Sequence, residues 1–288
     1  MDSNTFTILP MSQRFTLQPG ETYEGEITIV NPVDAENDFA YRAEVAPYGV
    51  KQKEDARADY DVDLTTDSRY TEMSKWIKIE EPTGKIKPNE TKKLKFTITV
   101  PKDAAGGGQY AAITVASDAE ATSGEGVAVQ NVFEMASIIY GAVNGEIKHE
   151  GEIQENNVPG FVVSTPVTVS AMIKNSGNMH EDAAVVISVK NFFTGEVILP
   201  TEEDSGEYSE LIMPETTRYI ERDISNLPAL GVVKINQKIY YQGTLSEVER
   251  DVVICPIWFM ALVALTLAAI VTTIVMIVKK HRKKKVLA

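Results

Sequence analysis

Apolar and polar residues alternate over many short segments of this chain, with the period of two that places one side of a β-strand in a core. Clear examples are Phe39–Val45 and Leu94–Val100, in which every second residue is apolar. Gly, Pro, Asn and Asp separate such segments, and no long stretch before residue 252 carries the apolar stripe of an amphipathic helix. Short alternating strands joined by turns are typical of antiparallel β-sandwiches.

Three corners of similar sequence lead into strands: Pro19-Gly20, Pro88-Asn89 and Pro214-Glu215. Proline presets the first central φ of a β-turn, and Gly20 or Asn89 tolerates the positive φ that a type II turn needs next. Glu215 tolerates a positive φ poorly. We therefore predict type II turns at the first two corners and a type I turn at the third.

The pattern repeats in two halves. Apolar segments that end at an Asn-led turn occur at Glu26–Pro32 and again at Ala171–Asn178, and the least patterned stretch, 145–159, lies between them. We predict an all-β fold, with two tandem Ig-like β-sandwich domains followed by a single C-terminal transmembrane α-helix. Trp76 is expected in the first core. The predicted bounds are 1–146 and 147–251 for the sandwiches, 252–278 for the helix and 279–288 for a basic cytoplasmic tail.

The transmembrane helix is predicted from one uncharged stretch. Ile254 to Val278 runs for 25 residues without a charged side chain, and a helix of about 20 apolar residues spans the hydrocarbon core of a bilayer. Trp258 falls near its outer boundary, where an amphipathic ring prefers to lie. Membrane lipid is therefore an expected partner through this helix.

Six positive charges without an acid follow the apolar stretch, beginning with Lys279, Lys280 and Arg282. Basic residues beside a span stay in the cytoplasm, which predicts a single-pass cell-membrane protein with its N-terminal part outside. A nucleic-acid patch is the alternative, and a stop-transfer anchor is the better interpretation. Residues 1–7 show no signal peptide, so we expect a longer precursor that carries one.

Charge differs sharply between the two sides of the span. The chain has a net charge of −13, and the part before the basic tail has 22 basic against 41 acidic residues, a net charge of −19. Such an exterior repels nucleic acid, and no nucleic-acid partner is expected. The only cysteine, Cys255, lies at the membrane boundary, so the exterior has no disulfide, which is compatible with bacterial export.

The segment 51–74 is a polar, acidic insertion in the first sandwich and the predicted partner-binding loop. Its candidate contact residues are Asp55, Asp59, Tyr60, Asp61, Asp63 and Asp67. Alternate carboxylates could also hold Ca²⁺, but Leu64 stands where an EF-hand needs glycine, and Tyr70 where it needs glutamate. We therefore predict a solvated acidic loop and assign no metal site, and the sequence leaves open whether this loop binds Ca²⁺.

Catalytic chemistry is not expected. The three histidines, His149, His180 and His281, are far apart, and His180 reads as a turn residue. Gly106–Gly108 lacks the following Lys-Ser/Thr of a phosphate loop, so it reads as a tight turn into a packed strand. No cofactor is predicted, and a membrane-anchored hydrolase is the least favoured of three functional hypotheses.

Six stretches follow one another in a recognisable order: Phe15–Asn31, Trp76-Ile77 followed by Ile86–Pro88, Phe96–Pro101, Ala104–Ile113, Ile173–His180 and Asn191–Gly195. Together they resemble the WxL-interacting proteins of Gram-positive cell surfaces. The family has a signal peptide, a peptidoglycan-binding-type Ig-like domain, a second Ig-like domain, one transmembrane helix and a basic tail. The resemblance implies attachment near the cell wall and capture of partner surface proteins, and it assigns no individual binding residue.

The leading functional hypothesis is a non-enzymatic surface adaptor that binds cell-wall peptidoglycan or a secreted surface protein. The alternative is a membrane-tethered assembly chaperone that acts by edge-strand donation, and it differs from the adaptor in having to release its client. The sequence leaves open which partner is bound and the oligomeric state.

Overall fold

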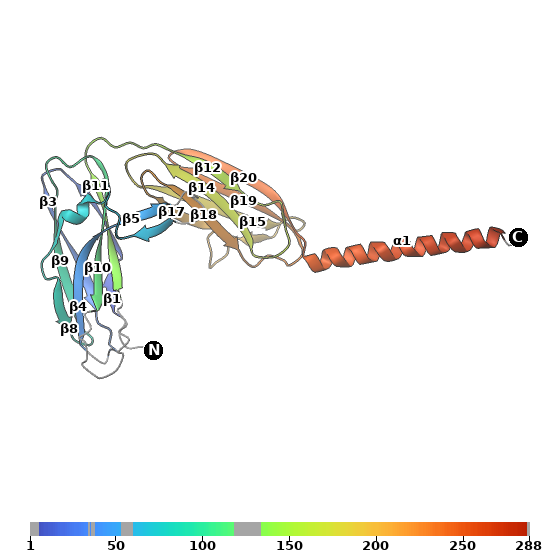
Figure 1. The fold of residues 1–288 in the computed structure, drawn as a ribbon, viewed down its shortest axis with the longest axis horizontal. Coiled ribbons are helices and arrows are strands. Elements are labelled where there is room, and N and C mark those ends of the chain that lie inside the picture. Colours follow the sequence, from blue (N-terminus) through green and yellow to red (C-terminus); the bar gives the residue numbers. More distant parts are fainter. Residues whose placement is uncertain (1–5, 34, 36–37, 53–59, 118–133, 287–288) are drawn as a thin grey trace. The chain divides into compact units, whose positions relative to one another are not determined.

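The structure is a computed structural model that describes residues 6–33, 35, 38–52, 60–117 and 134–286. Strands dominate, and one apolar helix ends the chain (Figure 1). The predicted fold class, two Ig-like β-sandwiches and a C-terminal helix, is confirmed. The chain forms two compact units: the first comprises residues 1–151, 174–181 and 212–218, and the second comprises residues 152–173, 182–211 and 219–288.

Two sheets make up the β-sandwich of the first unit. One has the order β1-β3-β9-β7, with bounds Thr7–Leu9, Thr22–Val30, Thr91–Thr99 and Ile77–Ile79. The other has the order β2-β11-β10-β4-β8, with bounds Ser12–Leu17, Glu134–Val143, Gly107–Ser117, Phe39–Pro47 and Thr83–Ile86. Strand β2 pairs with β11 in parallel, and the other pairs of this sheet are antiparallel.

The predicted alternation builds the core of the first unit. Phe39, Tyr41 and Ala43 are buried on β4. Every second residue of Leu94–Val100 is buried on and just after β9. Trp76 is partly buried against this core, which confirms its predicted place. Burial of apolar surface at about 25 cal/mol per Å² is the main term that holds two such sheets face to face.

Two buried asparagines close corresponding corners of the chain. The Asn31 side chain donates to the carbonyl of Ile86 at 3.0 Å, and the Asn175 side chain donates to the carbonyl of Ile212 at 3.1 Å. Each acceptor is the residue that opens a Pro-containing corner. The Asn-led turns that the sequence predicts are therefore structural, because each amide satisfies a carbonyl that would otherwise be buried without a partner.

The third corner differs from its prediction. Gly20, Asn89 and Glu215 all have positive φ, of 86°, 62° and 58°. The type I turn predicted at Pro214-Glu215 is wrong, because Glu215 adopts the left-handed conformation despite its Cβ. Such a residue costs roughly 1–2 kcal/mol relative to an unstrained one, so the packing around this corner must hold it in place.

The described residues of the insertion 51–74 contain two strands and a short helix. Strands β5 (Gly49–Gln52) and β6 (Tyr60–Asp63) form an antiparallel pair, in which Val50 lies opposite Val62. A 3₁₀-helix, η1 (Glu72–Lys75), follows and buries Met73. The two ends of the predicted loop are thus fixed by backbone pairing and by packing.

The second unit also contains two sheets. One has the order β12-β14-β18, with bounds Gly151–Asn157, Val167–Asn175 and Thr217–Ile224. The other has the order β13-β20-β19-β15-β16, with bounds Phe161–Val162, Thr244–Ile254, Gly231–Tyr241, Glu181–Asn191 and Val197–Leu199, and β17 (Glu207–Ile212) also pairs with β15. The buried Gln237 side chain donates to Asn156 and to the Ser170 carbonyl, each at 2.9 Å.

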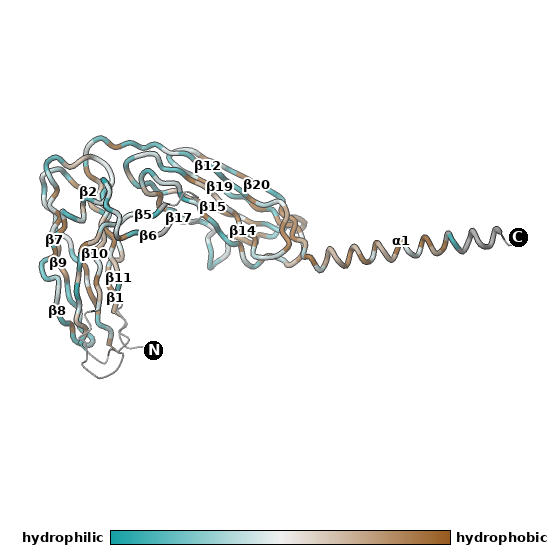
Figure 2. The backbone as a smooth tube through the Cα atoms, viewed as in Figure 1, coloured by the Kyte–Doolittle hydropathy of each residue, from teal (hydrophilic) through white to brown (hydrophobic). Residues whose placement is uncertain are grey.

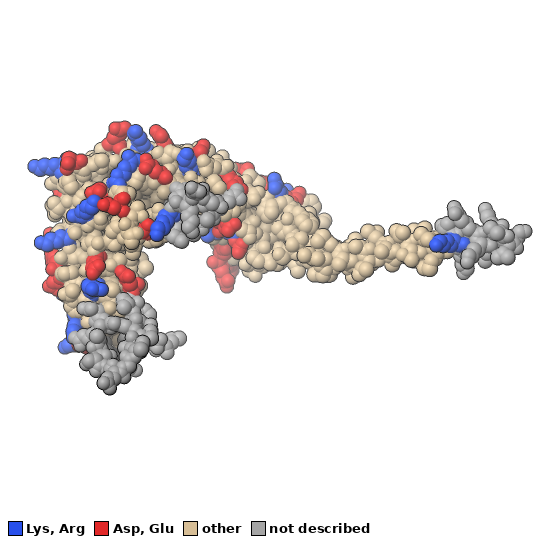
Figure 3. Space-filling view, viewed as in Figure 1, with Lys and Arg blue, Asp and Glu red and all other residues tan. Residues whose placement is uncertain are grey.

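The C-terminal helix, α1 (Ile257–Val286), begins three residues after β20 ends. Its segment Ile257–Ile277 is long and apolar enough to cross a membrane, and none of it is buried inside the protein. Figure 2 shows the brown colour of apolar residues along this segment, and Figure 3 shows no charged side chain over most of its length. An exposed helix of this composition fits a membrane anchor.

Candidate binding site

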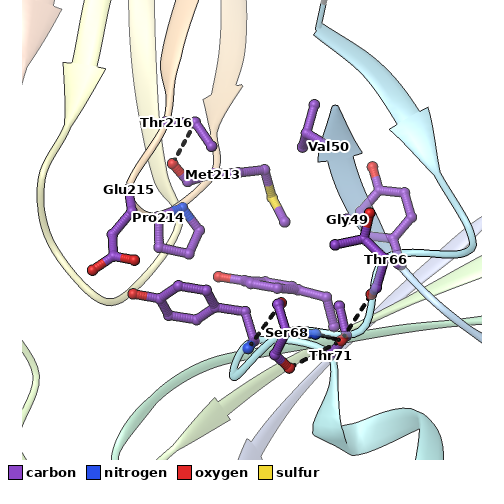
Figure 4. Close-up of a pocket in the computed structure, with 12 residues that line it drawn as sticks. Gly49, Val50, Thr66, Ser68, Thr71, Met213, Pro214, Glu215 and Thr216 are labelled. Carbon is purple, nitrogen blue, oxygen red and sulfur yellow. Dashed lines mark hydrogen bonds between the residues drawn. The ribbon is translucent and has the colours of Figure 1, made fainter. Parts of the chain in front are cut away.

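The first unit contains a small pocket next to the insertion (Figure 4). Its volume is about 170 Å³. Three tyrosines, four serine or threonine residues and the Pro214-Glu215 corner surround it; the lining residues are Tyr48, Gly49, Val50, Thr66, Ser68, Tyr70, Thr71, Tyr110, Met213, Pro214, Glu215 and Thr216. We call it the tyrosine pocket.

A chain of side-chain hydrogen bonds shapes one wall of the tyrosine pocket. The Asp63 carboxylate accepts from the Thr65 hydroxyl at 2.6 Å, from the Thr66 hydroxyl at 2.5 Å and from the Thr65 backbone N–H at 2.8 Å. These bonds, with the hydroxyl of Thr65 as the largest cause, hold the pKa of Asp63 well below its usual range. Asp63 is only 6% exposed, so it stabilises the turn and does not face a partner.

The next turn uses its hydroxyl groups internally. The Thr71 hydroxyl accepts from the Ser68 backbone N–H at 2.8 Å and donates toward the carbonyls of Thr66 and Ser68. The Ser68 hydroxyl accepts from the Tyr70 N–H at 3.2 Å. Across the pocket, the Thr216 hydroxyl donates to the Met213 carbonyl at 2.7 Å. The pocket wall is therefore chemically more apolar than its residue names suggest.

Strand β10 anchors the tyrosine pocket through its first residues. The Tyr110 N–H donates to the Tyr70 carbonyl at 2.7 Å. The Gln109 side chain accepts from the Met73 N–H at 3.2 Å and donates to the Arg69 carbonyl at 2.7 Å. The backbone leading into η1 is thus fastened to the central sheet of the first unit.

The glycine run is explained by close backbone approach. Gly107 has a φ of +123°, and a Cβ there would lie 2.6 Å from the Asn178 carbonyl oxygen. The Gly108 N–H donates to that same oxygen at 2.8 Å. The packed strand is confirmed, but the predicted tight turn is wrong, since Gly107 and Gly108 are the first residues of β10. They serve a close approach, because a side chain would push the two backbones apart.

Aromatic rings form a cluster beneath the tyrosine pocket. The Tyr110 ring centre lies 5.9 Å from that of Tyr140 and 5.5 Å from that of His180, and Tyr140 lies 5.9 Å from Tyr48. The His180 N–H donates to the Tyr110 hydroxyl at 2.9 Å, and the His180 Nδ1 lies 3.0 Å from the same oxygen. His180, predicted as a turn residue, thus helps to position a pocket residue. Edge-to-face packing of this kind stabilises the fold by about 0.5–1.5 kcal/mol per pair, in addition to the burial of the rings.

An ion pair marks the rim of the tyrosine pocket. The Arg69 guanidinium donates to the Glu215 carboxylate and to the Tyr70 hydroxyl. Partial burial raises the pKa of Tyr70, so its ring stays neutral at physiological pH. Glu215 is the residue in the left-handed conformation. A strained residue at the rim of a cavity is a typical feature of a binding site.

The predicted contact residues lie in different environments. Asp67 is exposed and pairs with Lys75 at 3.2 Å, whereas Asp63 is buried in its turn. Tyr60 and Asp61 lie on β6, and their side chains fall outside the described part, as do Asp55 and Asp59 altogether. Among the described residues, no group of three or more His, Cys, Asp or Glu side chains could hold a metal ion.

The predicted membrane-anchor residues lie on α1. Trp258 is 62% exposed in its first turn, and Lys279 is exposed near the end of the apolar segment. Lys280 and Arg282 continue the helix backbone. Their order along α1 fits a boundary ring at one end and a basic flank at the other.

The pocket residues Tyr48, Tyr110 and Met213 were missed in the sequence analysis. Two sequence features lie beside these residues: the glycine run before Tyr110, and the Pro-containing corner after Met213 that resembles two other corners of the chain. Neither signal indicates that the two segments meet.

A second candidate site lies along the free edge of β3. Strand β1 pairs only with Thr28–Val30, so no strand in the described part of the chain covers the outer edge of Thr22–Ile27. A groove of about 470 Å³ includes Glu24–Glu26 of this edge and extends to Lys95 and Phe96 of the neighbouring strand β9. Gly25 lies in it, over the ring of Phe96, and Gln13 donates to the Glu26 carbonyl at 3.1 Å. We call it the β3 groove.

No family model matches the sequence, and no curated protein matches it. Among solved structures, the chain is similar to the class 5 fimbriae chaperone CfaA, with 11% identity over 88% of this chain and 100% of that one and a TM-score of 0.40. It is similar to the E. coli chaperone DraB, with 12% identity, 86% and 96% coverage and a TM-score of 0.39.

A third similar structure is the CsuC-CsuE chaperone-tip adhesion subunit pre-assembly complex of Acinetobacter baumannii, with 13% identity, 85% and 98% coverage and a TM-score of 0.39.

Proposed function

We propose that this protein is a membrane-anchored, non-enzymatic surface protein that binds a secreted surface protein by taking one of its side chains into the tyrosine pocket. The pocket itself carries the proposal. A cavity of about 150 Å³ lined by apolar groups accepts a ligand of benzene size. At about 170 Å³, the tyrosine pocket suits one aromatic or branched aliphatic side chain.

The chemistry of the pocket wall favours a protein over a wall glycan. A sugar ring needs several free hydrogen-bonding groups, but the hydroxyls of Thr66, Ser68, Thr71 and Thr216 are bonded within the protein. Aromatic walls around a single desolvated pocket are instead typical of a hot spot at a protein interface. The resemblance to WxL-interacting proteins supports the same choice, since it implies capture of surface proteins.

The proposed topology follows from the helix and its flanks. With α1 across the membrane and its basic end inside, the two β-rich units lie outside the cell, where a secreted partner can reach them. Nothing in the tyrosine pocket combines a nucleophile with a base, so binding without chemical change is the function that its residues support.

A matched pair of substitutions on β5 tests this function. Val50 lines the tyrosine pocket, whereas the next residue, Lys51, is exposed and points to the other side of the strand. In the full chain in lipid nanodiscs, Val50→Trp should fill the pocket and weaken binding of a secreted WxL-domain protein at least about tenfold, the loss of roughly 1.4 kcal/mol. Lys51→Trp should bind as the wild type does, because it removes only a long ion pair with Asp63, at 3.7 Å, from a lysine that is otherwise exposed.

The same titration with purified peptidoglycan separates the two partners named by the sequence analysis. Binding of the WxL-domain protein that is unchanged in a folded Val50→Trp variant would contradict the pocket proposal. Binding of peptidoglycan alone, lost in Val50→Trp, would replace the protein partner by a glycan.

The β3 groove favours a second candidate function, the assembly chaperone. The Glu26 carbonyl faces away from β9. This direction is shown by the Gln13 side chain, which donates a hydrogen bond to it from the outer side of β3. Backbone groups of alternate residues face the same way, so Glu24 presents its N–H and C=O to the same free edge. An extended client segment could add there as a strand and place a side chain beside Gly25, against Phe15 and Phe96.

Proline at an outward N–H blocks strand addition but leaves the existing β3–β9 pairing intact. Glu24→Pro should therefore abolish binding of a secreted subunit at this edge, and Glu24→Gln should not. A chaperone must also release its client, so labelled subunit should dissociate when an excess of assembling subunits is added. Retention of the labelled subunit would favour the adaptor.

A further inference from the structure

Three loops of the second unit gather around the point where the chain leaves its last strand. They are residues 159–166, 191–196 and 225–230, here called the end loops. Ile254, the last residue of β20, pairs with Gly231 on β19 and with Val162 on β13. The Phe192 N–H donates to the Val232 carbonyl at 3.1 Å, which brings the second loop to the same end of the sheet.

The end loops expose large apolar side chains. Phe193 is 76% exposed, Phe161 is 53% exposed and Phe192 is 46% exposed, and Val163 and Leu230 are also exposed. The rings of Phe192 and Phe193 pack edge to face at 5.2 Å, so they stand together as one projection. Soluble surfaces rarely keep such aromatic groups in water unless a partner covers them.

Charge is almost absent from the end loops. Glu196 is their single charged residue, although charged residues make up 24% of the chain. Further along the same strands, Lys234 pairs with Glu249 at 2.9 Å and Lys238 pairs with Glu247 at 3.3 Å. Charged pairs therefore begin within a few residues of the end loops, and Figure 2 shows brown backbone where the second unit passes into α1.

We propose that the end loops insert their apolar side chains into the outer interface of the same bilayer that α1 spans. This inference rests on the proposed membrane anchoring. Only Cys255 and Pro256 separate β20 from α1. An extended residue spans at most about 3.6 Å, so the end loops cannot lie far from the surface at which α1 enters the membrane.

The composition of the end loops fits the lipid interface better than a specific protein partner. Phe and Leu lower their free energy at the boundary between headgroups and acyl chains, and the interface requires no matching shape. Trp258 is 62% exposed in the first turn of α1, and a tryptophan at the end of a span prefers the same lipid interface. Together the helix and the loops would hold the second unit at several points on the membrane.

Nitroxide labels on single cysteines in the full chain, reconstituted in nanodiscs of phosphatidylcholine and phosphatidylglycerol, test this placement. The native protein offers Cys255 as its only cysteine. Two further proteins carry Cys255→Ser with either Phe193→Cys in an end loop or Tyr240→Cys near the β19–β20 turn. Tyr240 is the matched control, because it is a 45% exposed aromatic residue at the opposite end of the same sheet.

Collision with oxygen, which concentrates in lipid, is compared with collision with a nickel chelate, which stays in water. Oxygen should dominate at Phe193→Cys and at Cys255, and nickel at Tyr240→Cys. Val163→Cys reports on a second end loop and should behave like Phe193→Cys, which keeps the test decisive if one variant misfolds.

Nickel dominance at Phe193→Cys and Val163→Cys, with oxygen dominance at Cys255, would overturn the inference and leave the anchor intact. Nickel dominance at Cys255 would instead overturn the membrane anchoring of the proposed function. Protection of the end-loop labels from both reagents would show that a protein surface, such as a second copy of the chain, covers them, and would overturn the lipid assignment.

Discussion

The tyrosine pocket and the end loops both present aromatic side chains, but in opposite ways. In the pocket, Tyr110 is completely buried, hydrogen-bonded to His180 and fixed against a glycine run. In the end loops, Phe193 is 76% exposed and its ring packs edge to face against that of Phe192. A rigid concave site can select one side chain, whereas a projecting apolar loop suits a partner without defined shape. Aromatic residues therefore do not identify a partner until their burial is known.

The largest expected difference between the two regions is in stability. Tyr110→Ala should lower the free energy of unfolding of the first unit by about 3–5 kcal/mol, since it removes a buried ring and leaves a cavity. Phe193→Ala should change stability by less than about 0.5 kcal/mol, because its ring lies at the surface. Urea denaturation of the full chain in detergent measures both. Equal losses for the two variants would contradict the contrast drawn here.

Two glycines sharpen the comparison at the level of the backbone. Gly107 and Gly195 both have positive φ, but a Cβ at Gly107 would meet Asn178, whereas a Cβ at Gly195 has nothing within 4 Å. Gly195→Ala should cost about 1–2 kcal/mol, the cost of a left-handed alanine. Gly107→Ala should cost more, because backbone must also move.

Thermal melting measures both glycine variants, and Gly160→Ala serves as the control, since Gly160 has no positive φ and only Arg250 nearby. A smaller loss of thermal stability in Gly107→Ala than in Gly195→Ala would contradict this prediction. It would show that the backbone at Asn178 moves away from position 107 at little cost.

A smaller effect is expected from pH at the edge of the tyrosine pocket. The folded pKa of Asp63 lies below its unfolded value because Thr65 and Thr66 donate to it. Its contribution is therefore fully present above the unfolded pKa, about 3.9, and is lost as pH falls through the folded pKa. Asp63→Asn should destabilise the first unit at pH 7, and the difference from wild type should shrink as the pH falls below about 4.

Urea midpoints at several pH values check this prediction. Asp67→Asn is the control, because Asp67 makes only an exposed ion pair with Lys75, and such pairs contribute little. A difference in stability between wild type and Asp63→Asn that grows toward low pH would contradict a lowered pKa of Asp63 in the folded state.

Much of the fold could be predicted from local pattern. The alternation in Phe39–Val45 and Leu94–Val100 predicts strands because a strand buries every second residue, and β4 and β9 confirm it. The turn at Glu215 could not be predicted, since its left-handed φ goes against the preference of glutamate. There, tertiary packing outweighs a local preference of roughly 1–2 kcal/mol.

The candidate site could be predicted only in part. The polarity of the insertion predicts a binding loop, and its last part does border the tyrosine pocket through Thr66 and Tyr70. The charge of its acidic residues predicts partner contacts, yet the described ones are a buried turn carboxylate, Asp63, and an exposed ion-pair member, Asp67. Charge in a sequence does not distinguish a carboxylate that faces a partner from one that closes a turn.

By itself, the sequence determined the β-rich body and the apolar helix. Alternation with a period of two buries its apolar residues only as a strand, and an uncharged run of 25 residues satisfies its backbone groups in lipid as a helix. Only the tertiary structure decided where the binding surfaces lie. Tyr48, Tyr110 and Met213 meet through strand register and a backbone approach at Gly107, and the end loops meet because Gly231 and Val162 both pair with Ile254. Such encounters depend on which strands become neighbours, and strand pairing joins residues far apart in the chain.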